Sequence, residues 1–186
     1  MEGGDDPKND HEQVYLWTKQ HFEGHLALEF EFMPRQHNGL SLLMLQASGM
    51  QREDFMADYP LRTTGAMNMV FMENVRGYHW EFFREMDDTR NDVASSALIK
   101  QPWQRPLAYY CLNRQLALHE WHRVQFVQEG PRLRGAIDGE LVFDVTDDPF
   151  AHTGGFYQCG HIAIRCMTKT KNFYRNLKIH TRSPFR

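Results

Sequence analysis

The fold is decided by a stretch in the last third of the chain, Trp121-His-Arg-Val-Gln-Phe-Val-Gln-Glu-Gly-Pro-Arg-Leu-Arg-Gly-Ala-Ile-Asp-Gly-Glu-Leu-Val-Phe-Asp144. Apolar and polar residues alternate in it over short runs, which is typical of strands with one buried face. Turn-forming residues at 129–131 and at Asp138–Gly139 interrupt the alternation. The stretch therefore predicts three antiparallel strands joined by two tight turns.

The same pattern extends to most of the chain. In His25–Phe32, alternate residues are apolar, so one face of a strand is predicted to be buried. Further strands are predicted over 40–47, 67–73, 78–84, 160–166 and 173–180, with a turn at Arg76–Gly77, a helical turn within 51–60 and a long irregular segment over 85–106. Many short strands separated by turns predict an all-β sandwich of two antiparallel sheets. We expect a flexible lead over residues 1–12 and one domain over residues 13–186.

Composition excludes several classes of protein. The 186 residues suffice for one domain with a core, and 41% of them are hydrophobic. The net charge of −3 gives no reason to expect nucleic acid or an anionic membrane as a partner. The polar amino terminus is unlike a signal peptide, and three cysteines without CxxC spacing indicate reduced thiols. These features predict a cytoplasmic protein, or a periplasmic or secreted one if a signal was removed in cloning.

Several weak motifs occur in a fixed order, and their order carries more weight than any one of them. They are Tyr78–Arg84, Leu98–Lys100 with Pro102, Trp121, Asp138–Gly139, the set Gly160, Ile162, Arg165 and Met167, and Asn176–Leu177. Over residues 15–180 the chain resembles the YesU-like group, a bacterial family of unknown function found near pectin-degrading enzymes. That group lies in the concanavalin A-like lectin/glucanase superfamily. The resemblance implies a jelly-roll sandwich with one concave, glycan-binding sheet.

The strand Tyr78–Arg84 carries the best candidate for a site. Alternation places His79, Glu81 and Phe83 on one face, and Tyr78 with Trp80, Phe82 and Arg84 on the other. A His and a Glu on one sheet face suit acid–base chemistry or sugar contact. The alternative is a hydrogen-bonded His beside a solvated Glu. His79, Glu81 and Tyr78 are the predicted catalytic residues.

Cations and polar side chains form the predicted substrate-binding set. Arginine pairs bidentately with a carboxylate, and a cation stabilises the enolate that forms when a proton next to a carboxylate is removed. Arg84, Lys100 and Arg165 are the candidates, although ordinary surface charge is the alternative for each. Among the tryptophans, Trp103 in a proline-flanked loop is the best stacking platform, whereas Trp121 is expected in the core. Asn68, in the predicted strand 67–73, completes the set.

No motif predicts a cofactor. His119 and His122 face opposite sides of a strand, which argues against a shared zinc ion. Asp144, Asp147 and Asp148 offer a weak candidate for structural calcium. Glu29 and Glu31 alternate on a strand, but without the further carboxylates of the glucanase "ExDxxE" strand, so two-carboxylate hydrolysis is disfavoured.

Three functional hypotheses remain. The first is a lyase or dehydratase that acts by elimination on oligosaccharides containing uronic acid. The second is a glycoside hydrolase, including the type that acts on 3-keto-glycosides, and the third is a non-catalytic sugar-binding module. The expected partner is an acidic oligosaccharide or polysaccharide. A homodimer is also predicted, because strands that open the fold in the resembled group have no counterpart before Tyr15; the alternative is that residues 14–18 supply the edge strand.

Overall fold

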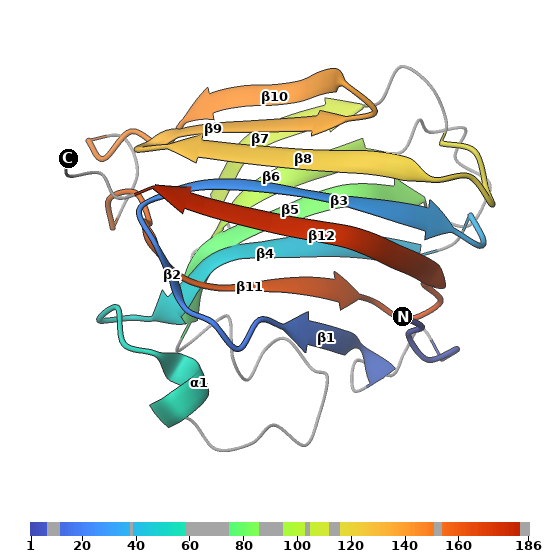
Figure 1. Cartoon of the computed structure of the whole chain (residues 1–186), viewed down its shortest axis with the longest axis horizontal. Helices are drawn as coiled ribbons and strands as arrows, with labels where there is room; N and C mark the ends of the chain where they lie inside the picture. Colours follow the sequence, from blue (N-terminus) through green and yellow to red (C-terminus); the bar gives the residue numbers. More distant parts are fainter. Residues whose placement is uncertain are drawn as a thin grey trace.

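The computed structural model describes residues 1–6, 12–37, 39–58, 75–85, 95–102, 105–111, 116–150 and 154–182, without the side chains at positions 57, 58, 84, 85, 95 and 111. Figure 1 shows these residues as two sheets packed face to face, with a short helix beside one of them. The predicted all-β sandwich of two antiparallel sheets is therefore confirmed. No described helix has the length and apolar character needed to cross a membrane.

The two sheets are built from strands that are distant in sequence. In spatial order, the five-stranded sheet consists of β10 (Glu140–Thr146), β9 (Arg132–Ile137), β8 (His122–Glu129), β3 (His25–Pro34) and β12 (Asn172–Arg182). In the same order, the seven-stranded sheet consists of β1 (Val14–Trp17), β11 (Cys159–Cys166), β4 (Gly39–Gly49), β5 (Val75–Glu85), β6 (Ser95–Gln101) and β7 (Arg105–Cys111), with β2 (Phe22–Glu23) paired to β11. The helical turn predicted within 51–60 is α1 (Phe55–Asp58).

The stretch that decides the fold forms β8, β9 and β10 as predicted. Between β9 and β10, Asp138 and Gly139 have φ values of 52° and 82°. Positive φ at both central residues defines a type I′ hairpin turn, whose twist matches that of the flanking strands. The local sequence therefore determines this hairpin.

The main core lies between the sheets. Leu26, Leu28, Phe30 and Phe32 of β3 are at most 3% exposed, which confirms the predicted buried face. Opposite them, Trp80 of β5 has its ring 5.1 Å from that of Phe143 and 6.1 Å from that of Phe82. Aromatic packing of this kind contributes to the stability of the sandwich beyond simple burial.

A second apolar cluster covers the opposite face of the seven-stranded sheet. Leu43 and Leu45 of β4 face the main core, whereas Leu42 and Met44 pack with Phe55 beside α1. Because β4 is covered on both faces, its sequence is uniformly apolar rather than alternating. We call the face that carries Leu42 and Met44 the outer face of the seven-stranded sheet.

Three predictions about the strands are corrected by the structure. β6 and the start of β7 lie in the segment predicted to be irregular, and Arg76–Gly77 belongs to β5 rather than to a turn. Val14–Trp17 form an edge strand paired with β11. This agrees with the alternative in which residues 14–18 supply the edge strand. The strand predicted over 67–73 lies outside the described residues.

The first residues of the chain make backbone contacts with a segment that is distant in sequence. The Met1 amino group donates to the Asn172 carbonyl at 2.8 Å, and Gly3 N donates to Thr170 O at 2.9 Å. Lys169 N in turn donates to Gly4 O at 2.7 Å. Residues 1–4 therefore lie along residues 169–172 with regular backbone hydrogen bonds.

Candidate functional site

Strand β5 divides the predicted catalytic residues between two environments. His79 and Glu81 point to the outer face of the sheet and are 3% and 7% exposed. Tyr78 points between the sheets and is fully buried. Phe83 does not share the face of His79, because a register shift between β4 and β5 turns it into the main core.

Strand register brings Arg165 onto the same face as Glu81. Glu81 pairs with Leu42 of β4, Leu42 pairs with Arg165 of β11, and Arg165 pairs with Tyr15 of β1. Residues directly opposite one another in neighbouring strands share a face of the sheet. Glu81, Leu42, Arg165 and Tyr15 therefore form one row, in which a single strand separates the Glu from the Arg.

A second row lies beside the first. It runs from Ile99 of β6 through His79, Met44 and Ala163 to Trp17 of β1. The rings of Tyr15 and Trp17 are stacked in parallel, with centroids 6.0 Å apart. We call His79, Glu81, Arg165, Tyr15 and Trp17 the outer-face site.

Arg165 is held at the β1 end of this site. It is 2% exposed, donates a hydrogen bond to the Gln13 side chain, and has its guanidinium carbon 5.1 Å from the centre of the Tyr15 ring. The aromatic ring and the amide fix the direction of the guanidinium. An arginine held in this way is suited to receive a carboxylate.

Gly160 explains why β11 lies so close to β4. Its φ of +152° is rare for residues with a side chain, and an added Cβ would lie 2.3 Å from the backbone carbon of Gln46. Glycine thus permits a close approach at the bulge between the two strands. This approach sets the position of the strand that carries Arg165.

His79 has a neighbour on β6. Its Nδ1 lies 3.5 Å from Nε2 of Gln101, whose backbone carbonyl accepts a hydrogen bond from the Tyr157 hydroxyl at 2.8 Å. The imidazole is therefore adjacent to a buried amide whose strand is fixed by Tyr157. This contact orients the ring on the outer face.

His161 belongs to the same face, although the sequence analysis did not select it. Its Nε2 lies 2.7 Å from Asp54 Oδ1 and its Nδ1 lies 3.0 Å from the Thr18 carbonyl oxygen. Phe55 packs edge-on against both His161 and Trp17. The alternation of β11 places His161 on the face of Arg165, and this was the available signal.

Lys100 and Tyr78 do not join the outer-face site. The Lys100 ammonium lies between the sheets, 2.8 Å from Asp147 Oδ2, and both side chains are 0% exposed. Tyr78 donates to the same carboxylate at 2.8 Å. Burial, followed by the charge of Asp147, raises the pKa of Tyr78 well above its ordinary value. Neither residue is on the face that carries His79.

The remaining predicted residues cannot be placed in the site. Arg84 lies in β5, but its side chain is outside the described part of the chain, as are Trp103 and Asn68. Trp121 is half-buried rather than in the core, with the Arg175 guanidinium 3.8 Å from the centre of its ring. It lies beside the five-stranded sheet.

The carboxylates considered for metals or hydrolysis have other partners. Asp144 pairs with Arg132, Asp147 pairs with Lys100, and His122 Nδ1 lies 2.8 Å from Asp138. Glu29 and Glu31 lie on the outward surface of the five-stranded sheet, paired with cations. Within the described ranges, no three His, Cys, Asp or Glu side chains are grouped so as to hold a metal ion.

Comparison with known proteins identifies a family and a fold. Residues 2–179 match a family described as a domain of unknown function (DUF1961), and no curated protein matches the chain. A Bacillus subtilis protein of unknown function with a galectin-like fold is similar, with a TM-score of 0.84, 19% identity, and coverage of 97% of this chain and 87% of that one.

Two other solved structures share the fold at lower similarity. The carbohydrate-binding module CBM66 from Bacillus subtilis has a TM-score of 0.57 and 12% identity, with coverage of 97% of this chain and 84% of that one. The Crh5 transglycosylase has a TM-score of 0.54 and 11% identity, with coverage of 96% and 72%. At these identities the similarity establishes the fold alone. The lectin-like sandwich is confirmed, and the narrower placement in the YesU-like group stays a prediction.

Proposed function

The chain belongs to the DUF1961 family of domains of unknown function, and from its outer-face site we propose that it binds an acidic oligosaccharide. A carbohydrate-binding module and a transglycosylase share its fold, which supports a carbohydrate-related role. The observation that carries the proposal is the convergence of Arg165, Glu81 and His79 with the stacked pair Tyr15 and Trp17 on one sheet face.

Each part of the site matches one part of such a ligand. The apolar face of a pyranose ring packs against an aromatic side chain, and Tyr15 and Trp17 are both partly exposed. A uronate adds a carboxylate, which Arg165 can receive bidentately on the adjacent strand. Glu81 and His79 supply hydrogen-bonding groups further along the two rows.

Binding is tested by calorimetry with trigalacturonate and its neutral methyl ester. Trp17→Ala should weaken binding of both about 2- to 10-fold, because an aromatic contact is lost. Arg165→Gln should remove the preference for the acid over the ester. Trp121→Ala is the matched control, since Trp121 is also half-buried but lies beside the other sheet. Equal affinities for wild type and Trp17→Ala would reject the outer face as the binding surface.

We further propose that the site eliminates across a uronate. His79 removes the proton from the carbon next to the carboxyl group, and Arg165 stabilises the enolate charge that develops. The electron pair then forms a carbon–carbon double bond as the bond to the leaving oxygen breaks, and protonated Glu81 donates a proton to that oxygen. Glu81 takes the helper role because the Tyr78 hydroxyl donates to Asp147 between the sheets.

Turnover distinguishes elimination from the other chemistries. An elimination product absorbs ultraviolet light as a conjugated unsaturated uronate, and His79→Ala should lower this rate by about 10² to 10⁴. New reducing ends without that absorbance would instead indicate a hydrolase. Wild-type turnover in His79→Ala would remove this residue from the mechanism.

A non-catalytic binding module is the second candidate. The side chains of His79 and Glu81 are only 3% and 7% exposed, so a substrate has little access to them as acid or base. Tyr15 and Trp17 are partly exposed and accessible to a sugar, which favours binding without catalysis. A binding module should turn over nothing, both as wild type and as His79→Ala. Release of an unsaturated product that depends on His79 would favour the enzyme.

A homodimer also remains a proposal, although its basis changes. Val14–Trp17 supply the edge strand, so no missing strand requires a partner. Support comes instead from Val14 and Leu16, which are 38% and 58% exposed on an edge strand without charged residues. Leu16→Lys should convert a dimer to a monomer in light scattering. A wild-type mass near 22.0 kDa would reject the dimer.

A further inference from the structure

Arg76 is a largely buried arginine to which no carboxylate of the described residues is paired. It is 8% exposed, and its Nε donates to Ser48 Oγ at 3.1 Å. Its guanidinium carbon lies 4.9 Å from the centre of the Tyr157 ring. Within the described part of the chain, these contacts leave a largely buried guanidinium without a carboxylate beside it. Buried charges are ordinarily paired, so this arrangement requires an explanation.

The neighbouring charges do not neutralise Arg76, because they neutralise one another. Lys100 Nζ lies 2.9 Å from Asp147 Oδ1 and also donates to the Gly155 carbonyl at 2.6 Å. The second oxygen of Asp147 accepts from Tyr78. Lys100 Nζ is also 4.9 Å from the Tyr157 ring centre, so both cations contact this ring, but the Asp147 carboxylate pairs with Lys100. Arg76 therefore carries the excess positive charge of this cluster.

Four other arginines in the described ranges do have carboxylate partners. Carboxylates pair with Arg123, Arg132, Arg134 and Arg175 on the outward surface of the five-stranded sheet. Those four side chains are more exposed than Arg76 and need a counterion less. None of the described residues supplies such a counterion to Arg76.

The geometry of Arg76 leaves one edge of its guanidinium available. Ser48 accepts from Nε and leaves the two terminal nitrogens for other acceptors, and the residue keeps 8% of its surface exposed. Two parallel N–H groups match two oxygens of a carboxylate or a sulfate. The ring of Tyr157 and the hydroxyl of Ser48 hold the group in place before any ligand arrives.

We propose that Arg76 is the centre of an anion subsite that takes the carboxylate or sulfate group of a saccharide. It is separate from the outer-face site, because Arg76 pairs with Ser48 on the face of β5 that carries Tyr78, whereas His79 faces outward. In Figure 1 this subsite belongs to the end of the sandwich at which β4 ends and β5 begins. The attachment of the anion to a saccharide rests on the proposed function. The binding of an anion by Arg76 does not rest on it.

Thermal unfolding with and without anions tests the subsite. The probes are trigalacturonate, its neutral methyl ester and inorganic sulfate, at constant ionic strength. A ligand that binds only the folded state raises the melting temperature. Trigalacturonate or sulfate should raise that of wild type more than that of Arg76→Met, and the methyl ester should affect both equally. A response to trigalacturonate identifies a uronate as the source of the anion, and a response to sulfate alone identifies a sulfate group.

The stability of the variants without ligand provides a second readout. Arg76→Met removes a buried unpaired charge and keeps the volume, so it should melt no lower than wild type. Arg76→Lys keeps the charge but not the paired nitrogens, and should bind the anion about tenfold more weakly. Arg134→Met is the control, because Arg134 pairs with Glu129 and should not affect anion binding.

Two results would overturn the inference. One is an anion-dependent rise in melting temperature that is as large in Arg76→Met and Arg76→Lys as in wild type. The other is a strongly lowered melting temperature of Arg76→Met, which would give Arg76 a structural role. The outer-face site is tested independently, because Trp17→Ala and Arg165→Gln should leave the response that depends on Arg76 unchanged.

Discussion

At the scale of single residues, the Lys100 ammonium is the most constrained charge between the sheets. It lies 2.8 Å from Asp147, and both side chains are fully buried. Lys100→Met leaves that carboxylate buried without a cation, so we expect the free energy of unfolding to fall by about 3–5 kcal/mol. Urea denaturation measures the loss. The double variant Lys100→Met/Asp147→Asn should recover most of it, and an unchanged single variant would contradict a buried ion pair.

Phe30 and Ile162 test which faces of the strands form the core. Each is 1% exposed in the cluster between the sheets. Phe30→Ala and Ile162→Ala should each lower the free energy of unfolding by about 2–5 kcal/mol, because a cavity replaces the side chain. Leu141→Ala is the control: Leu141 is 59% exposed, and its loss should change stability by less than about 0.5 kcal/mol. Similar losses in all three variants would contradict the assignment of faces.

The sequence predicts the orientation of some site residues and not of others, for a physical reason. Alternation is a local property, so it correctly separates His79 and Glu81 from Tyr78. The position of Lys100 depends on Asp147, a partner far along the chain, and no local pattern reveals a buried pair of that kind. Arg76 escapes sequence analysis in the same way, since a charged residue is expected to be solvated.

At the scale of elements, the outward surface of the five-stranded sheet is a ladder of ion pairs across neighbouring strands. Glu29 of β3 accepts hydrogen bonds from Lys178 of β12 and Arg123 of β8, and these lower its pKa from 4.5 to about 2. A carboxylate whose pKa is lower in the folded state than in the unfolded state stabilises the fold. This stabilisation is complete above the pKa of the unfolded state and is lost as the pH falls through the pKa of the folded state.

Glu29→Gln measures that contribution. The difference in melting temperature between wild type and this variant should be constant above pH 4.5 and should shrink as the pH falls toward 2. Salt should reduce the difference, because the pairs are exposed to solvent. A difference that does not depend on pH would mean that the Glu29 carboxylate is not stabilised by its partners.

The elements that the sequence predicts are those with local signals. The hairpin at Asp138–Gly139 is encoded by its turn residues, and β3 by strict alternation. β6 was not predicted, because its sequence, Ser-Ser-Ala-Leu-Ile-Lys-Gln, has no clean alternation and buries Lys100 and Gln101. β1 has only four residues, and its pairing with β11 is decided by tertiary structure.

At the scale of the whole molecule, the amino-terminal residues are attached to the start of β12. Residues 1–4 make backbone hydrogen bonds with residues 169–172. We expect removal of residues 1–5 to lower the free energy of unfolding by about 1–3 kcal/mol, since several hydrogen bonds are lost while the chain entropy of ordering them is regained. Asp5→Asn with Asp6→Asn is the control that keeps those bonds. Unchanged stability after removal would favour a flexible lead.

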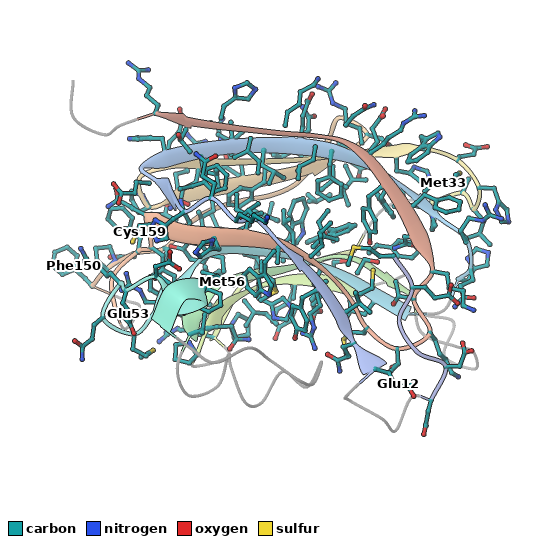
Figure 2. All side chains as sticks on the ribbon, turned by 60° about the horizontal axis from the view of Figure 1, so that its bottom comes forward. Glu12, Met33, Glu53, Met56, Phe150 and Cys159 are labelled. Atoms are coloured by element: carbon teal, nitrogen blue, oxygen red, sulfur yellow. The ribbon has the colours of Figure 1, made fainter. Side chains whose placement is uncertain are left out.

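Phe150 is the most exposed of the large apolar side chains that the structure describes. Figure 2 shows Phe150 directed away from the body of the molecule, at the end that also carries Cys159 and Glu53. Phe150 is 99% exposed, but a single exposed apolar side chain is ordinary for a soluble domain. The exposed apolar residues of β1 therefore remain the better basis for contact with a second copy.

The pairing of β1 with β11 also determines the order in which the molecule can fold. Val14 lies opposite Cys166, so β1 can pair only after β11, about 150 residues later, has been synthesised. Until then, the strand that carries Tyr15 and Trp17 has no partner in the sheet. Pairings so distant in sequence slow folding, typically to milliseconds or seconds for β-sandwiches. The aromatic part of the outer-face site should thus be completed only after β11 has been synthesised.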